Sequence, residues 1–120
     1  MRVKNILIIG FVLLLASPPT ANAVTWQEQM LDSVNSIRAE KSVTPLKMCR
    51  PLVKAAQSYA KKMALQDFLN HTGRDGSTPG SRIQKAGYDW MNSRKGSMIA
   101  ENIAAGQNSV VEVMRGWSRS

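Results

Sequence analysis

The chain has 120 residues, and its 16 Lys and Arg residues against 8 Asp and Glu residues give it a formal net charge of +8. A chain of this length can bury only one modest hydrophobic core, and its single cysteine, Cys49, excludes an internal disulfide framework. We expect the Cys49 thiol to be buried as a small hydrophobe, with a link between two chains as the alternative.

The first 23 residues have the pattern of a signal peptide. Arg2 and Lys4 precede an apolar run at 6–16, and the segment ends in the small residues Ala-Asn-Ala. The apolar run is shorter than the about 20 residues that a membrane-spanning helix needs. We therefore predict cleavage before Val24 and export to the periplasm or the extracellular space.

The remaining residues, 24–120, are predicted to form one domain with a net charge of +6, because cleavage removes only two basic residues from the stated +8. On charge alone, we expect such an exported domain to favour anionic surfaces, such as a phospholipid membrane or an envelope surface. A solvated basic surface is the simpler interpretation. No nucleic-acid-binding motif is present, so we predict no nucleic-acid partner.

The first half of this domain has the pattern of two helices. Thr25 and Glu28 form a capping box, and apolar residues at helical spacing then predict a helix to about Glu40. Asn35 and Arg38 lie one turn apart on it, and we expect them to tie the helix to neighbouring loops. A second helix is predicted over 51–69, with its apolar face formed by Leu52, Ala56, Tyr59 and Met63.

The second half alternates turns with short elements. Glycine and proline interrupt the chain over 72–80, and a short helix is predicted over 81–86, closed by Gly87. Residues 98–103 have the pattern of a short strand. A last helix is predicted from Ser109, where a second capping-box pattern is followed by Val110, Val113, Met114 and Trp117 on one face.

Two residues of this half carry candidate chemistry. His71 is the only histidine and lies in a glycine-rich turn, and Glu101 is an isolated carboxylate in an apolar run. If they meet in a cleft, an imidazole and a carboxylate can act as acid–base partners or as metal ligands. Taken alone, a structural hydrogen-bonding histidine and a solvated glutamate are the simpler interpretations. No serine, threonine or cysteine nucleophile stands out by motif, which favours a non-catalytic protein.

Six segments in order give the chain a family resemblance. It resembles the CAP or SCP superfamily, which comprises cysteine-rich secretory proteins, antigen 5 and plant pathogenesis-related proteins, and its single cysteine makes it similar to the disulfide-poor bacterial branch. The matching segments are 34–38, 55–64, 68–73, 82–88, 100–104 and 117–120. The resemblance implies an α/β fold, the CAP-type α-β-α sandwich. Here we expect an incomplete form, with the helices and the first strand present and the closing strands absent.

The resemblance also implies a cleft with two histidines and, in many members, two glutamates. His71 matches the first histidine, Glu101 matches the first glutamate, and Ser120 stands at the position of the second glutamate. The second histidine would follow Ser120, so we expect 24–120 to be a partial CAP/SCP domain. His71 and Glu101 provide two metal ligands where zinc sites usually have three or four, so zinc is expected only in a complete form of the domain.

Three functions follow from these observations. The resemblance implies a secreted binding module for a lipid-like ligand, a small molecule or a partner protein, and many family members have no established enzymatic activity. The first alternative is a hydrolase in which His71 acts as general base and Glu101 orients it. The second is a basic envelope-associated protein that binds anionic surfaces.

Overall fold

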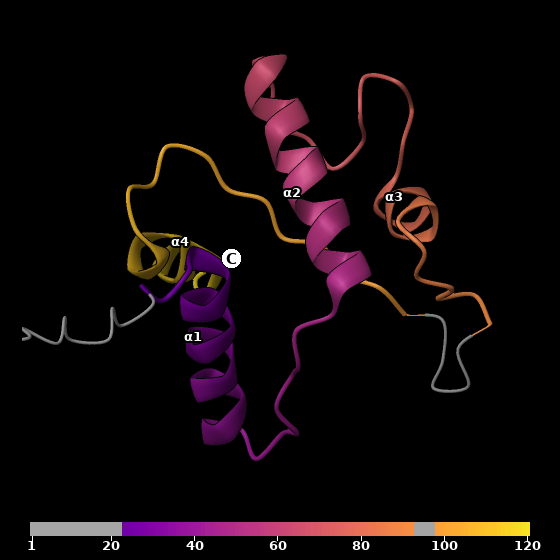
Figure 1. Ribbon diagram of the computed structural model, residues 1–120. Coiled ribbons are helices and arrows are strands. Elements are labelled where there is room, and N and C mark those ends of the chain that lie inside the picture. The colour runs from indigo at the N-terminus through magenta and orange to yellow at the C-terminus, as the bar shows by residue number, and fades with distance from the viewer. Residues whose placement is uncertain (1–22, 93–97) are drawn as a thin grey trace, which may run out of the picture.

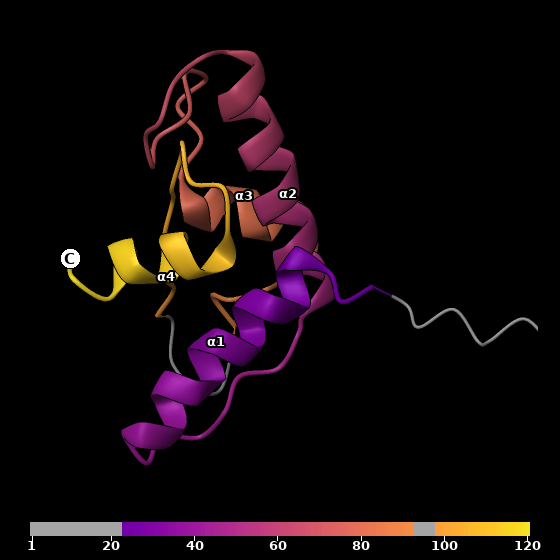
Figure 2. The same cartoon turned by 90° about the vertical axis from the view of Figure 1, so that its left-hand side faces the viewer.

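The computed structural model describes residues 23–92 and 98–120, in which four helices are joined by long loops (Figure 1). The helices are α1 (Trp26–Glu40), α2 (Arg50–Leu65), α3 (Pro79–Lys85) and α4 (Val110–Trp117). α1 packs against α4 and α2 packs against α3, an arrangement that both views show (Figure 2). Within the described ranges, no helix combines the length and apolar character needed to cross a membrane. The predicted signal peptide lies outside these ranges except for Ala23.

The start of α1 confirms the predicted capping box. The Thr25 hydroxyl accepts a hydrogen bond from the Glu28 amide at 3.2 Å, and the Glu28 carboxylate accepts one from the Thr25 amide at 2.8 Å. These bonds satisfy two of the backbone donors that a helix start leaves free. The hydrogen bond from the Thr25 backbone also lowers the pKa of Glu28 below its ordinary value. The predicted end of this helix at Glu40 is likewise confirmed.

Asn35 and Arg38 anchor the loop that follows α1, as predicted. Asn35 donates to the Leu46 carbonyl at 3.0 Å and accepts from the Leu46 amide at 2.7 Å, and Arg38 Nε donates to the Thr44 carbonyl at 2.7 Å. A side-chain amide can replace a missing backbone partner in this way. The loop between α1 and α2 is therefore tied to the helix before it.

α2 ends four residues before the predicted boundary at 69. Asp67 adopts a left-handed conformation with φ of +50°, and the Phe68 amide donates to the Met63 carbonyl at 3.2 Å. This is the hydrogen bond of a Schellman motif, which closes a helix and reverses the chain. The Phe68 ring then packs edge-on against Tyr59, with the ring centroids 6.3 Å apart. The reversal brings the following loop back along α2.

The predicted strand at 98–103 and the α-β-α sandwich built on it are wrong. The described residues contain no strand, and the backbone of 98–104 pairs with no other described segment. Instead this segment crosses behind α2 and runs to α4 without regular structure (Figure 1). A strand needs a neighbouring backbone that completes its hydrogen-bond ladder, and a run of apolar residues does not supply one. The described fold is helical.

The two remaining helix predictions are confirmed, apart from their boundaries. α3 begins two residues earlier than predicted and is followed by Gly87 at φ of +96°. At α4 the Ser109 hydroxyl accepts from the Glu112 amide at 3.2 Å, whereas the Glu112 carboxylate accepts from the amide of Asn108. The capping box at α4 is therefore formed only in its first half.

The buried apolar residues are few and lie on two helices. They are Ala55, Tyr59 and Met63 on α2 and Val110 and Val113 on α4. Trp26, Leu46 and Met48 remain about half exposed beside a largely apolar groove of about 420 Å³ between α1 and α2. Cys49, at the start of α2, is half-buried as a free thiol.

Candidate functional site

The loop that carries His71 is folded tightly by its own polar groups. Asn70 Oδ1 accepts from the Thr72 amide at 2.8 Å, and Gly73 donates to the Ser77 carbonyl at 2.8 Å. A Cβ atom at Gly73 would lie 2.5 Å from Asp75 Oδ1, so a larger residue here would have to displace that side chain. Such local bonds hold a loop in one conformation without regular structure. The position of His71 is therefore defined by its neighbours in sequence.

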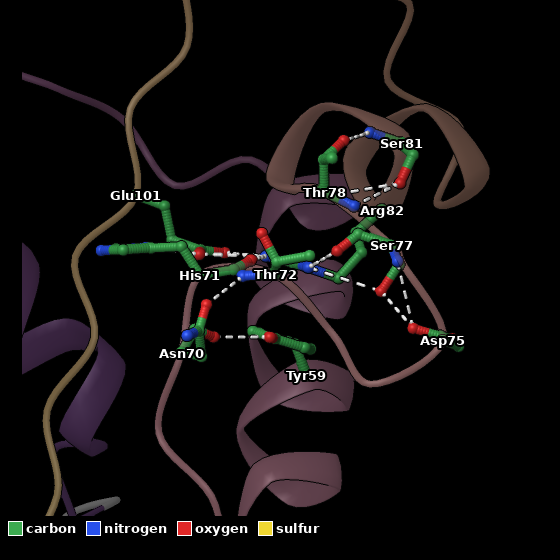
Figure 3. A network of polar contacts seen from close by, with 10 residues as sticks. All are labelled: Tyr59, Asn70, His71, Thr72, Asp75, Ser77, Thr78, Ser81, Arg82 and Glu101. Atoms are coloured by element: carbon green, nitrogen blue, oxygen red, sulfur yellow. Dashed lines mark hydrogen bonds and ion pairs between the residues drawn. The ribbon is translucent and has the colours of Figure 1, made fainter.

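Two contacts fasten this loop, residues 70–78, to α2. The Tyr59 hydroxyl donates to the Asn70 carbonyl at 2.6 Å, and the Lys62 ammonium pairs with the Asp75 carboxylate. The hydrogen bond from Lys62, followed by those from Ser77, holds the pKa of Asp75 far below its ordinary value of 3.8. Figure 3 shows the hydrogen bond between the Tyr59 side chain of α2 and Asn70 of this loop.

His71 and Glu101 meet, although 30 residues separate them. His71 Nδ1 lies 2.9 Å from Glu101 Oε1 (Figure 3). Because a carboxylate only accepts hydrogen bonds, Nδ1 is the donor here, and the Nε2 lone pair of the neutral imidazole is left available. The His71 side chain is 56% exposed and that of Glu101 is 20% exposed, so the imidazole is the accessible member of the pair.

Arg82 completes the site. Its Nη2 donates to both Glu101 oxygens, at 2.9 Å to Oε1 and 2.7 Å to Oε2, and also to the His71 carbonyl at 3.0 Å. Nη1 donates to the Ser77 carbonyl at 2.9 Å. The guanidinium carbon lies 3.4 Å from the centroid of the buried Tyr59 ring, a cation–π contact. Arg82 thus joins α2, the His71 loop and the segment that carries Glu101.

The start of α3 positions this arginine. Thr78 and Ser81 cap the helix reciprocally, with the Ser81 amide donating to the Thr78 hydroxyl at 3.3 Å and the Thr78 amide donating to the Ser81 hydroxyl at 2.9 Å. Arg82 follows directly after Ser81. A capped first turn fixes the direction of the side chains that it presents.

An open groove of about 460 Å³ runs past the exposed imidazole. Its polar end is formed by His71 and Glu101, and its remaining lining consists of Thr78, Pro79, Gly80, Trp90, Ile99 and Ala100. Trp90 donates from its indole nitrogen to the Gly80 carbonyl at 3.2 Å, which places the indole ring directly over the glycine. The groove therefore combines one hydrogen-bonding end with an apolar wall.

The third predicted site residue lies apart from this pair. The Ser120 hydroxyl donates to the Trp117 carbonyl at 2.8 Å, and among the described residues no hydrogen bond joins Ser120 to His71 or Glu101. The structure thus brings together two of the three predicted residues, and their roles in binding stay predictions.

Sequence reasoning missed Arg82 and the part played by Tyr59. Arg82 stood in the matched segment 82–88, and Tyr59 was placed on the apolar face of its helix. The sequence contained one signal: Arg82 directly follows the Thr78–Ser81 capping pattern. This pattern gives the position of Arg82 on the helix but not the residues that its side chain contacts.

The residues present do not fit a zinc ion. Within 23–92 and 98–120, no three His, Cys, Asp or Glu side chains gather closely enough to hold a metal. Glu101 already accepts Arg82 on both oxygens and His71 on one. A zinc ligand must offer a free lone pair to a cation, and here a permanent positive charge lies against the carboxylate.

Comparison with known proteins gives a family for this chain. The cysteine-rich secretory protein family, abbreviated CAP, matches residues 31–120. The protein named "Uncharacterized protein YkwD" from Bacillus subtilis (strain 168) is 22% identical over 105 residues, which cover 88% of this chain and 38% of that relative. The chain thus spans well under half the length of this curated relative. No solved structure matches significantly. The family match covers most of the chain and confirms the resemblance seen in the sequence: the protein belongs to the cysteine-rich secretory protein (CAP) family.

Proposed function

We propose that the chain is an exported, non-catalytic binding module that takes a lipid-like small molecule in the groove beside His71. The observation that carries this proposal is the composition of the groove, which joins an accessible imidazole to an apolar wall of Trp90 and Ile99. Small-molecule sites have this character, with a few polar groups that orient a ligand and apolar surface that buries it. Export rests on the signal-peptide pattern of the first 23 residues.

The ligand class follows from the polar end of the groove. With Nδ1 donating to Glu101, neutral His71 has an acceptor, Nε2, for a ligand hydroxyl. The apolar wall suits one hydrocarbon chain. We therefore propose a single-chain amphiphile with an uncharged hydroxyl head group as the ligand class.

A hydrolase has less support. His71 held by Glu101 resembles a general base with its orienting carboxylate. However, no serine or threonine hydroxyl of the described residues is hydrogen-bonded to the His71 imidazole, and Thr78 and Ser77 are engaged in local structure: Thr78 caps α3, and the Ser77 hydroxyl donates to Asp75 at 2.7 Å. A nucleophile needs a hydroxyl that is hydrogen-bonded to the base. Non-catalytic binding is thus the better-supported function.

Binding of a monoacylglycerol to the purified exported chain tests the proposal. We expect saturable quenching or enhancement of tryptophan fluorescence that persists at high salt and is lost in Trp90→Phe. His71→Ala and Ile99→Ala should weaken binding, and Val111→Ala, at an exposed apolar position of α4, should leave it unchanged. Binding that high salt abolishes would favour the charge-driven envelope protein. Release of fatty acid that stops in His71→Ala would establish the hydrolase instead.

A further inference from the structure

The pairing of His71 with Glu101 resembles half of a metal site, yet the Glu101 carboxylate is already paired with Arg82. We propose that Arg82 is a specificity-determining residue that excludes divalent cations from His71 and Glu101. This inference is independent of the proposed ligand, because the probe that tests it is the metal ion alone.

The first support is the occupancy of the carboxylate. Oε1 accepts from Arg82 Nη2 and from His71 Nδ1, both at 2.9 Å, and Oε2 accepts from Nη2 at 2.7 Å. A zinc ion binds a carboxylate oxygen at about 2.0–2.2 Å, which would place its double charge beside the guanidinium. Arginine cannot relieve this repulsion by losing a proton. The cation and Arg82 therefore compete for Glu101.

The second support is that Arg82 cannot easily move aside. Its side chain is 11% exposed and rests on Tyr59, which is itself 3% exposed. Nη1 is bound to the Ser77 carbonyl at 2.9 Å and Nη2 to the His71 carbonyl at 3.0 Å. A metal that displaced Arg82 from Glu101 would also break these bonds and the contact with the ring. The exclusion is thus built into the packing around the arginine.

The third support is the scarcity of other ligands. The described parts of the chain hold no cluster of three His, Cys, Asp or Glu side chains, so an ion at His71 that lost Glu101 would lack the ligands of a stable site. One imidazole completed by water holds zinc weakly, because stable sites use three or four protein ligands. If the charge of Arg82 were removed, Glu101 would be free to bind the ion, which would then have two protein ligands instead of one.

Calorimetric titration of zinc into the exported chain tests this inference. We expect weak binding by the wild type, and binding at least about tenfold tighter by Arg82→Gln, which keeps hydrogen bonding and removes the charge. Arg82→Lys should bind as weakly as the wild type, because the ammonium still opposes the ion. The double variant Arg82→Gln/His71→Ala should lose the gain, which would show that the ion uses His71.

The wild type gives a second measurement that does not depend on how any variant folds. We expect the imidazole NMR signals of His71 to stay unchanged at zinc concentrations well below the dissociation constant of the wild type. A zinc-induced shift of these signals, together with tight one-to-one binding, would overturn the inference. A folded Arg82→Gln protein that binds zinc no better than the wild type would also overturn it, whatever the outcome of the monoacylglycerol experiment.

Discussion

Arg82 Nη2 donates hydrogen bonds to both carboxylate oxygens of Glu101, at 2.9 Å to Oε1 and 2.7 Å to Oε2, while the guanidinium packs on the ring of Tyr59. This relationship links a short helix to a segment that has no regular structure of its own. Because 19 residues separate the two side chains, their contact is a tertiary one. It holds Glu101 at the polar end of the His71 groove, and it is the least exposed ion pair among the described residues, with side chains 11% and 20% exposed.

Loss of this ion pair should destabilise the chain. In Arg82→Met the Glu101 carboxylate, whose side chain is 20% exposed, keeps its charge without its main partner. We expect the free energy of unfolding to fall by about 2–3 kcal/mol, measured by urea denaturation. Lys85→Met on the same helix is the control, because that side chain is exposed and should change stability little. Equal losses in both variants would contradict the prediction.

Gly80 should be required by the space around it. A Cβ atom there would lie 3.0 Å from Trp90 Cζ2 and 3.3 Å from Ile99 Cδ1, so Gly80→Ala must push the groove wall outward. We expect a loss of about 1–3 kcal/mol and altered Trp90 fluorescence. At Gly116 an added Cβ meets nothing within 4 Å, so Gly116→Ala should stabilise its helix by about 0.5–1 kcal/mol. A stabilised Gly80→Ala variant would show that the wall yields freely.

The Lys62–Asp75 pair should make stability depend on pH. The pKa of Asp75 is lowered in the folded chain by the hydrogen bond from Lys62, so its contribution is present above the unfolded value of 3.8 and is lost as the pH falls through the lower folded value. The wild type should exceed Asp75→Asn in stability near neutral pH, and the gap should narrow as the pH drops below 3.8.

Urea midpoints measured across this range, with Lys62→Met as the matched variant, check the assignment. If the pair is the main cause, Asp75→Asn should change stability less in the Lys62→Met background than in the wild type, because only the hydrogen bonds from Ser77 remain. Added salt should reduce the effect, since the pair is exposed to solvent. A gap that persists unchanged in acid would contradict the prediction.

The exported chain should begin at Val24. The Ala-Asn-Ala sequence before it provides the small residues that signal peptidase accepts, so N-terminal analysis of the secreted protein should read Val-Thr-Trp. Ala23→Leu should block or shift the cleavage. Recovery of a secreted protein that still begins at Met1 would refute the signal-peptide interpretation.

The sequence alone was enough to predict the local features of this protein. The start of α1 depends on Thr25 and Glu28, three residues apart, and this capping box was predicted. The capping pair of α3, Thr78 and Ser81, was not recognised in the sequence, and the start of that helix was predicted two residues late. Residue type and family resemblance also singled out His71 and Glu101, which the fold brings within 2.9 Å.

Only the tertiary structure decided the rest. Residues 98–103 have the composition of a strand, but a strand requires a second backbone, and none of the described segments provides one. α2 ends before the predicted boundary at 69, although the apolar pattern continues to that point. The reason is the left-handed conformation of Asp67, which closes the helix whatever residues follow it. The role of Arg82 could not be predicted for the same reason. Its partners come from three other segments: Tyr59, Ser77, His71 and Glu101. Such contacts depend on how the segments pack together, which spacing in the sequence does not reveal.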